Sequence, residues 1–167
     1  GMSVGMSAGM RVMVTGAAGY IGSVVARDLA AQGHDVLGVD FRPMPQIENS
    51  RVLDLNDAQA IDAAVAEVDA VCHLAWPMGQ WREADVSDAS DLGAGVRGLF
   101  HLLTSCVRHR VKRFVFQSTI NITGPSWDSW RITEDEVPRP GIDGYTLGKT
   151  LAEDLCRSFS RAHDITI

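Results

Sequence analysis

The chain has 167 residues, of which 46% are apolar and 22% charged, which indicates a globular domain and not a disordered or fibrous protein. Its net charge of −6 argues against a nucleic-acid partner, although backbone N–H groups can still hold a small phosphate ligand. No apolar run reaches the roughly 18 residues that a membrane span needs, so we expect a cytoplasmic protein with no membrane partner. The three cysteines and five histidines show no ligand spacing, and no metal site is expected.

Residues 1–9 are small and are predicted to be a flexible leader with a cloning scar, and residues 10–167 are predicted to form one domain. Apolar periodicity and turn residues place the elements of that domain. In chain order they are a strand at 10–15, a helix at 20–32, strands at 35–40 and 51–53, a helix at 56–67 capped by Asn56, a strand at 68–75, a helix at 89–109, a strand at 112–118, a helix at 145–162 and a strand at 164–167.

These strands alternate with helices and are continuous apolar runs, so both faces of the sheet should be covered. The pattern predicts an α/β fold with a doubly wound parallel sheet in three layers, α/β/α. Residues 120–144 contain no periodic element and are predicted to form a long functional loop.

The first strand leads directly into a glycine-spaced turn, Thr15-Gly16-Ala17-Ala18-Gly19-Tyr20-Ile21-Gly22, and then into a helix. The first glycine allows a sharp turn, the second lets the backbone approach a diphosphate, and the third lets the helix pack closely. The helix N-terminus then presents N–H groups and a positive dipole end to the phosphates. This segment predicts a dinucleotide site formed by Gly16, Ala18, Gly19, Tyr20, Ile21 and Gly22.

Asp40 ends the second strand, 18 residues after Gly22. A carboxylate at this place accepts hydrogen bonds from both ribose hydroxyls and repels a 2′-phosphate, which favours NAD over NADP. Arg42 lies two residues further on, and its guanidinium could instead pair with that phosphate.

Five segments together resemble the extended short-chain dehydrogenase/reductase family of NAD-dependent epimerases and dehydratases, over residues 10–167. These segments are TGAAGYIG from Thr15, Asp40, LDL at 53–55, HLA at 73–75, and FVFQST…YTLGK from Phe114 to Lys149. The resemblance implies a Rossmann-type NAD-binding domain, the N-terminal part of an enzyme that acts on a sugar or nucleotide-sugar hydroxyl.

By the same resemblance, Asp54 and Leu55 would border the adenine, and Leu74 and Ala75 would line the middle of the cofactor. Ser118 would lie against the nicotinamide, and Thr119 would take the place of the catalytic hydroxyl. His73 is expected to be structural.

Tyr145 and Lys149 form a Y-x-x-x-K pair, and a spacing of four residues puts both on one face of a helix. A phenol is a poor base at neutral pH because its ordinary pKa is about 10, and a nearby ammonium favours the phenolate. The resemblance makes Tyr145 the residue that exchanges a proton with the substrate, and it makes Lys149 a ligand of the nicotinamide ribose.

The sequence departs from the family in two ways. The family often has an asparagine in the long helix, in an N-V-x-G setting that here reads Gly95-Val96-Arg97-Gly98, so proton transfer to Lys149 is expected to be impaired or rerouted. The family's chains are also much longer, and most of the C-terminal substrate-binding portion is expected to be missing. A truncated NAD(H)-binding module without catalysis, or a fragment of a longer enzyme, is therefore the alternative hypothesis.

The resemblance also implies a homodimer through the helices at 89–109 and 145–162. Four tryptophans are expected at the ligand-binding edge of the sheet, where they contact substrate or shield the cofactor. They are Trp76, Trp81, Trp127 and Trp130.

Overall fold

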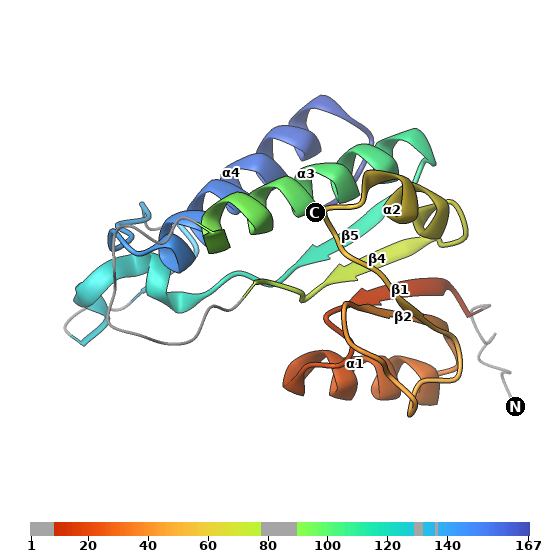
Figure 1. The fold of residues 1–167 in the computed structure, drawn as a ribbon. Helices are drawn as coiled ribbons and strands as arrows, with labels where there is room; N and C mark the ends of the chain where they lie inside the picture. The colour runs from red at the N-terminus through yellow and green to blue at the C-terminus, as the bar shows by residue number, and fades with distance from the viewer. Residues whose placement is uncertain (1–8, 78–89, 129–131, 136) are drawn as a thin grey trace, which may run out of the picture.

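The computed structural model describes residues 9–77, 90–128, 132–135 and 137–167. The strands are β1 (Arg11–Thr15), β2 (Asp35–Asp40), β3 (Ser50–Val52), β4 (Ala70–His73) and β5 (Arg113–Phe116). The helices are α1 (Tyr20–Ala31), α2 (Ala58–Val65), α3 (Ser90–Arg108), the 3-10 segment η1 (Ile120–Asp128) and α4 (Gly144–Ala162). The five strands are parallel and lie in the order β3-β2-β1-β4-β5, of which Figure 1 labels β2, β1, β4 and β5. The predicted doubly wound, Rossmann-type sheet is confirmed.

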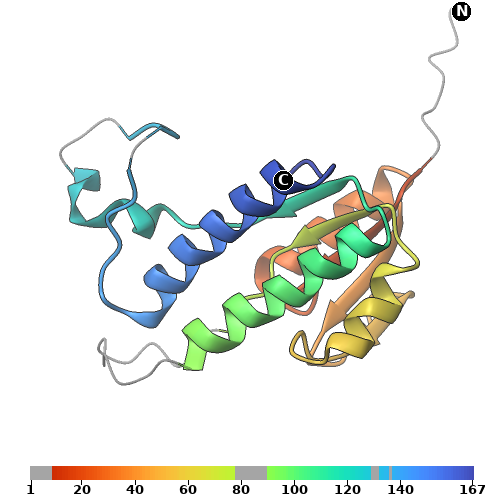
Figure 2. The same ribbon diagram turned by 90° about the horizontal axis from the view of Figure 1, so that it is seen from above.

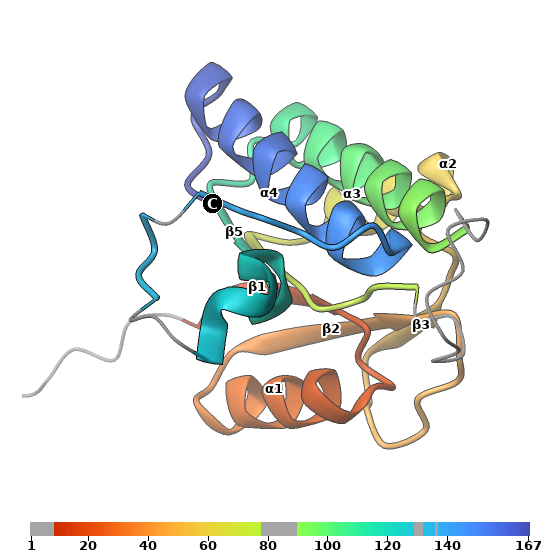
Figure 3. The same cartoon turned by 90° about the vertical axis from the view of Figure 1, so that its left-hand side faces the viewer.

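Alternate residues of the central strand β1 pack into two separate hydrophobic cores, one on each face of the sheet. Met13 packs in the core that α2, α3 and α4 cover. Val12 and Val14 face the opposite side, where Ala26 of α1 and Met44 from the β2–β3 connection complete a second core. Helices therefore lie on both faces of the sheet, which gives the predicted three layers (Figure 3).

The register of the sheet brings the carboxyl ends of the central strands together. Thr15, the last residue of β1, is paired with Val39 of β2 and with His73 of β4. The chain leaves β1 toward β2 and later returns to β4 on the other side of β1. Ligands of open α/β sheets bind at such a crossover point.

Three predictions about local structure were wrong. The helix predicted from residue 56 is capped by Asp57, whose carboxylate accepts hydrogen bonds from the N–H groups of Gln59 and Ala60, while Asn56 is bonded to Asp54 instead. The predicted loop at 120–144 begins with the 3-10 segment η1. The predicted strand at 164–167 is reduced to a single parallel bridge between Thr166 and Arg113.

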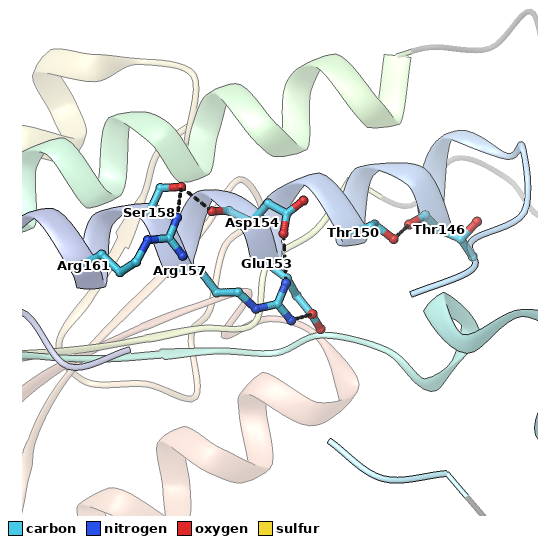
Figure 4. A network of polar contacts seen from close by, with 7 residues as sticks. All are labelled: Thr146, Thr150, Glu153, Asp154, Arg157, Ser158 and Arg161. Carbon is cyan, nitrogen blue, oxygen red and sulfur yellow. Dashed lines mark hydrogen bonds and ion pairs between the residues drawn. The ribbon is translucent and has the colours of Figure 1, made fainter. Parts of the chain in front are cut away.

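Helices α3 and α4 run side by side along the sheet (Figure 2). On α4, Arg157 pairs with Glu153 and Asp154 at 2.6 and 2.9 Å, and further polar contacts continue along the helix (Figure 4). Such exposed pairs contribute little stability each, about 0.3–0.5 kcal/mol. The position of α4 therefore depends mainly on its buried face, which includes Ala152 and Cys156.

Candidate functional site

A cleft of about 840 Å³ lies at the carboxyl edge of the sheet, at the crossover between β1 and β4. Its walls come from the ends of all five strands or the residues just after them, from the first turns of α1 and α4, and from Ala94 and Gly95 of α3. The volume is in the range of small-molecule and cofactor sites.

The turn between β1 and α1 forms one wall and requires glycine at two places. Gly16 has a φ of 71°, and an added Cβ would lie 2.8 Å from the backbone nitrogen of Ala75. A Cβ on Gly22 would lie 2.1 Å from the carbonyl oxygen of Gly16. Gly19 is the N-cap of α1 and supplies no side-chain hydrogen bond. The positive end of the helix dipole thus faces the cleft without a side-chain cap, which suits an anionic ligand.

Asp40 is held firmly at the end of β2, with only 6% of its surface exposed. One carboxylate oxygen accepts a hydrogen bond from the N–H of Ala18 at 3.1 Å. The other accepts hydrogen bonds from the backbone N–H and the Nε of Arg42, at 3.0 and 3.3 Å. The guanidinium of Arg42 also lies 5.3 Å from the ring centroid of Phe41. Arg42 is therefore engaged by Asp40 and Phe41 at the rim of the cleft.

A buried hydroxyl fixes the floor of the cleft. Thr15 Oγ1 lies 2.7 Å from His73 Nδ1 and accepts hydrogen bonds from the N–H groups of Leu74 and Ala75, both at 3.2 Å. Because those two N–H groups occupy its lone pairs, the hydroxyl donates its proton to Nδ1. Burial and the charge of Lys149 lower the pKa of His73 to about 3, so the ring is neutral at pH 7. His73 thus ties β4 to β1, as expected of a structural residue.

The opposite wall carries Tyr145 and Lys149, both on the first two turns of α4. Asp143 caps this helix, since its carboxylate accepts hydrogen bonds from the N–H and the hydroxyl of Thr146 at 2.8 and 2.6 Å. Lys149 is 3% exposed, and its Nζ donates to the carbonyl oxygen of Gln117 at 2.7 Å. Burial lowers the pKa of Lys149 to about 8.

The two hydroxyls after β5 differ in their surroundings. Ser118 lines the cleft, and its Oγ is buried with no hydrogen-bond partner among the described residues. Thr119 Oγ1 accepts a hydrogen bond from the N–H of Asn121 at 3.3 Å, at the start of η1, and it is not among the cleft-lining residues described.

The structure gathers fourteen of the sequence-predicted site residues around this one cleft. They are Gly16, Gly19, Tyr20, Ile21, Gly22, Asp40, Arg42, Asp54, Leu55, Leu74, Ala75, Ser118, Tyr145 and Lys149. Ala18 and Thr119 do not line it, although the N–H of Ala18 orients Asp40.

Sequence reasoning missed several lining residues. Phe41 and Gln117 could have been found, because each adjoins a predicted site residue at a strand end. Trp76 was predicted only to lie at the ligand-binding edge of the sheet, and Gly95 was noted only because the family often has an asparagine there. Both residues line the cleft. The side chains of Trp81, Trp127 and Trp130 lie outside the described part of the chain.

Among the described residues, no helix is long and apolar enough to cross a bilayer. The same residues hold no group of three or more His, Cys, Asp or Glu side chains that could bind a metal ion.

The parallel sheet with a glycine turn at its crossover point defines a Rossmann-type nucleotide-binding domain. The NAD dependent epimerase/dehydratase family matches residues 12–167, and the chain belongs to this family.

Among curated relatives, the 2-alkyl-3-oxoalkanoate reductase of Stenotrophomonas maltophilia is 35% identical over 152 residues, which cover 86% of this chain and 44% of the relative. The uronate dehydrogenase of Pseudomonas syringae is 32% identical, and the match covers 87% of this chain and 52% of the relative. The chain thus spans about half the length of these relatives.

Solved structures show the same fold. A short-chain dehydrogenase/reductase superfamily protein from Agrobacterium tumefaciens with bound NAD superposes with a TM-score of 0.83 at 33% identity, covering 93% of this chain and 46% of that one. The UDP-glucose 4-epimerase of Thermus thermophilus in complex with NAD gives 0.84 at 29% identity, covering 93% and 52%.

Proposed function

We propose that the cleft binds NAD and that this chain forms the cofactor-binding and proton-transfer part of an oxidoreductase, epimerase or dehydratase acting on a sugar or nucleotide-sugar hydroxyl. The observation that carries the proposal is that one cleft unites the glycine turn, Asp40 and the Tyr145–Lys149 pair. Related proteins support the substrate class, since they include a uronate dehydrogenase and a UDP-glucose 4-epimerase in complex with NAD.

The residues of the cleft fit a dinucleotide. A Cβ on Gly16 or Gly22 would clash with nearby backbone, so the tight turn is possible only because both residues lack one. The turn places the first residues of α1 beside the cleft, where their N–H groups would hold a diphosphate. Asp40 would accept the hydrogen bonds of the adenosine ribose. Arg42 is already paired with Asp40, so a 2′-phosphate would have to displace that contact, which favours NAD over NADP.

At the other end of the cleft, Tyr145 and Lys149 would transfer the proton of the substrate hydroxyl. When bound, the nicotinamide would supply the hydride chemistry. Tyr145, as the phenolate that the Lys149 ammonium stabilises, would take the proton of the substrate hydroxyl and become the neutral phenol. Ser118 Oγ, which has no partner among the described residues, would be available to the nicotinamide end. Thr119 is the second hydroxyl proposed to bond the substrate oxygen.

The proposal includes a homodimer through α3 and α4. Each helix carries a large apolar side chain that is about half exposed, Phe100 on α3 and Leu151 on α4, both at 49%. Because each side chain is already half buried, burying its exposed half against a second copy is worth about half of the roughly 1.5–3 kcal/mol for full burial, which is about 1 kcal/mol each. Sedimentation of the wild type and of a Phe100→Glu, Leu151→Glu double variant tests this, and a monomeric wild type would contradict it.

The proposed function is tested by Tyr145→Phe. NADH formation from a panel of uronates and nucleotide sugars should fall by about two orders of magnitude or more because the acid–base group is lost. The affinity for NAD, measured by calorimetry, should stay within about twofold of the wild type, as it should in the control Ser158→Ala, which removes an exposed hydroxyl of the same helix. Normal turnover in Tyr145→Phe would refute the assignment, and tight NAD binding with no turnover in the wild type would favour the non-catalytic module.

A further inference from the structure

Lys149 lies in an aromatic cage. Its Nζ is 4.3 Å from the centroid of the Trp76 ring and 4.8 Å from that of Phe116. These two rings also meet edge to face, with centroids 6.3 Å apart and an interplanar angle of 61°. Nζ also donates a hydrogen bond to the carbonyl oxygen of Gln117 at 2.7 Å. The negative ring faces therefore attract the ammonium from two sides while one of its three N–H donors is bound.

Two glycines make room for the indole. A Cβ on Gly95 of α3 would lie 2.7 Å from Trp76 Cζ2, and a Cβ on Gly148 of α4 would lie at the same distance from the same atom. Contacts this short exclude alanine at either place unless the whole indole moves. Gly95 stands at the position where the family resemblance leads one to expect an asparagine. In this chain the space beside Gly95 is filled by an aromatic ring.

The charged groups around Lys149 do not explain how its ammonium is accommodated. His73 on β4 is neutral, and Cys156 on α4 has a pKa raised to about 12 by burial, so it is a neutral thiol at pH 7. Tyr145 lies one turn before Lys149 on the same helix, and Gln117 presents a neutral carbonyl. The aromatic faces and that carbonyl are thus what the described surroundings offer to a positive charge.

We propose that Trp76 is a positioning residue for Lys149. Its indole occupies the space that Gly95 and Gly148 leave open, and together with Phe116 it holds the ammonium at the Tyr145 wall of the cleft. This inference deepens the proposed function and rests on it, because the position of the ammonium affects activity only if Lys149 stabilises the Tyr145 phenolate and binds the cofactor. The alternative role of Trp76 is simple filling of space, in which any apolar side chain of similar size would serve.

Lysine NMR separates these roles without a substrate. The sequence contains two lysines, Lys112 and Lys149, so a protein labelled with ¹³C at the lysine ε carbons gives two signals. Lys112 is exposed and ion-paired with Asp164 on the surface, and its signal is the internal reference. In the wild type, the Lys149 signal should be shifted upfield by the two rings and should titrate with a pKa of about 8.

The decisive comparison is Trp76→Phe against Trp76→Leu, two shorter apolar side chains that differ in having a ring. The Phe variant should retain an upfield shift and a depressed titration midpoint. In the Leu variant, the ammonium should leave the apolar site for solvent, so its midpoint should move toward the ordinary value of about 10.4. An unchanged midpoint in Trp76→Leu would mean that the indole only fills space, and the proposal would be overturned. A lower midpoint would support the proposal, because it would show that a still-buried ammonium has lost the attraction of the ring.

A second pair of variants on α3 tests the same idea without touching an aromatic residue. Gly95→Ala should displace Trp76 and reproduce the Leu variant's Lys149 signal. Gly93→Ala adds the same methyl to the same helix, and beyond its chain neighbours and its own helix backbone no atom of the described residues lies within 4 Å of the new Cβ, so it should leave the signal unchanged. Identical Lys149 signals in both alanine variants would contradict the proposal even if Trp76→Leu does not fold.

Calorimetry with NAD distinguishes this inference from the proposed function. NAD affinity should fall about tenfold in Trp76→Leu and only about twofold in Trp76→Phe, the range expected for loss of a desolvated cation–π contact. If NAD binding is equal in these two variants, Trp76 does not position Lys149 for the cofactor. If the wild type does not bind NAD at all, the proposed function fails, while the lysine titration still decides whether Trp76 holds the ammonium.

Discussion

Replacing Thr15 by valine tests the buried network beneath the cleft, because valine keeps the shape and removes the hydroxyl. Thr15 is fully buried, and the change leaves His73 Nδ1 and the N–H groups of Leu74 and Ala75 without their shared partner. An unsatisfied buried group costs about 1–3 kcal/mol. Because the two N–H contacts are long and only partly buried, we expect a total loss of about 3–5 kcal/mol, a large fraction of a typical domain's stability.

The matched control is Thr15→Ser, which keeps the hydroxyl and removes one methyl group. It should cost about 1 kcal/mol through lost packing. Urea unfolding of the three proteins gives the free energies, with an unchanged denaturant slope showing that only stability has changed. If Thr15→Val were no less stable than Thr15→Ser to within about 1 kcal/mol, the network would not be what ties β1 to β4, and the reasoning would be refuted.

Three further predictions concern Asp143, His73 and Asp40. Asp143→Ala removes the N-cap of α4 and should cost about 1 kcal/mol by urea unfolding, while Asp154→Ala, an exposed surface partner, should cost less than about 0.5 kcal/mol. His73 has a folded pKa of about 3, below its ordinary value of 6.5, so the unfolded state binds more protons between those values. Stability should therefore fall as pH drops through 6.5 toward 3, by at most roughly 4–5 kcal/mol from this residue, and ¹⁵N spectra that show a protonated His73 ring near pH 5 in the folded protein would contradict this. Asp40→Asn removes a charge that repels phosphate, so calorimetry should show the ratio of NAD to NADP affinity falling by about tenfold, and an unchanged ratio would count against the role of Asp40.

The sequence alone was enough to predict the sheet, its coverage and most of the cleft, because these depend on local patterns. Apolar runs of strand length and the glycines at 16, 19 and 22 determine a strand–turn–helix unit with few alternatives. The glycine turn and Asp40 were predicted from the residues themselves, whereas Leu74 and Ser118 were assigned to the cofactor by the family resemblance, and all of them line the cleft.

What sequence reasoning missed depends on contacts between distant elements. Asn56 and Asp57 are both good N-caps by composition, and the competing bond between Asn56 and Asp54 decides in favour of Asp57. The place of Trp76 depends on Gly95 and Gly148, which come from two different helices and share no local pattern with it. Their common role is visible only when α3 and α4 are packed against the end of β4.

The most direct test of the account is a crystal structure of this protein with NAD. We expect the diphosphate at the turn between Gly16 and Gly22, against the first N–H groups of α1. The adenosine ribose hydroxyls should lie on the carboxylate of Asp40, and the nicotinamide should lie near Tyr145 and Lys149. A dinucleotide bound away from this turn, or bound with Asp40 out of reach of the ribose, would contradict it.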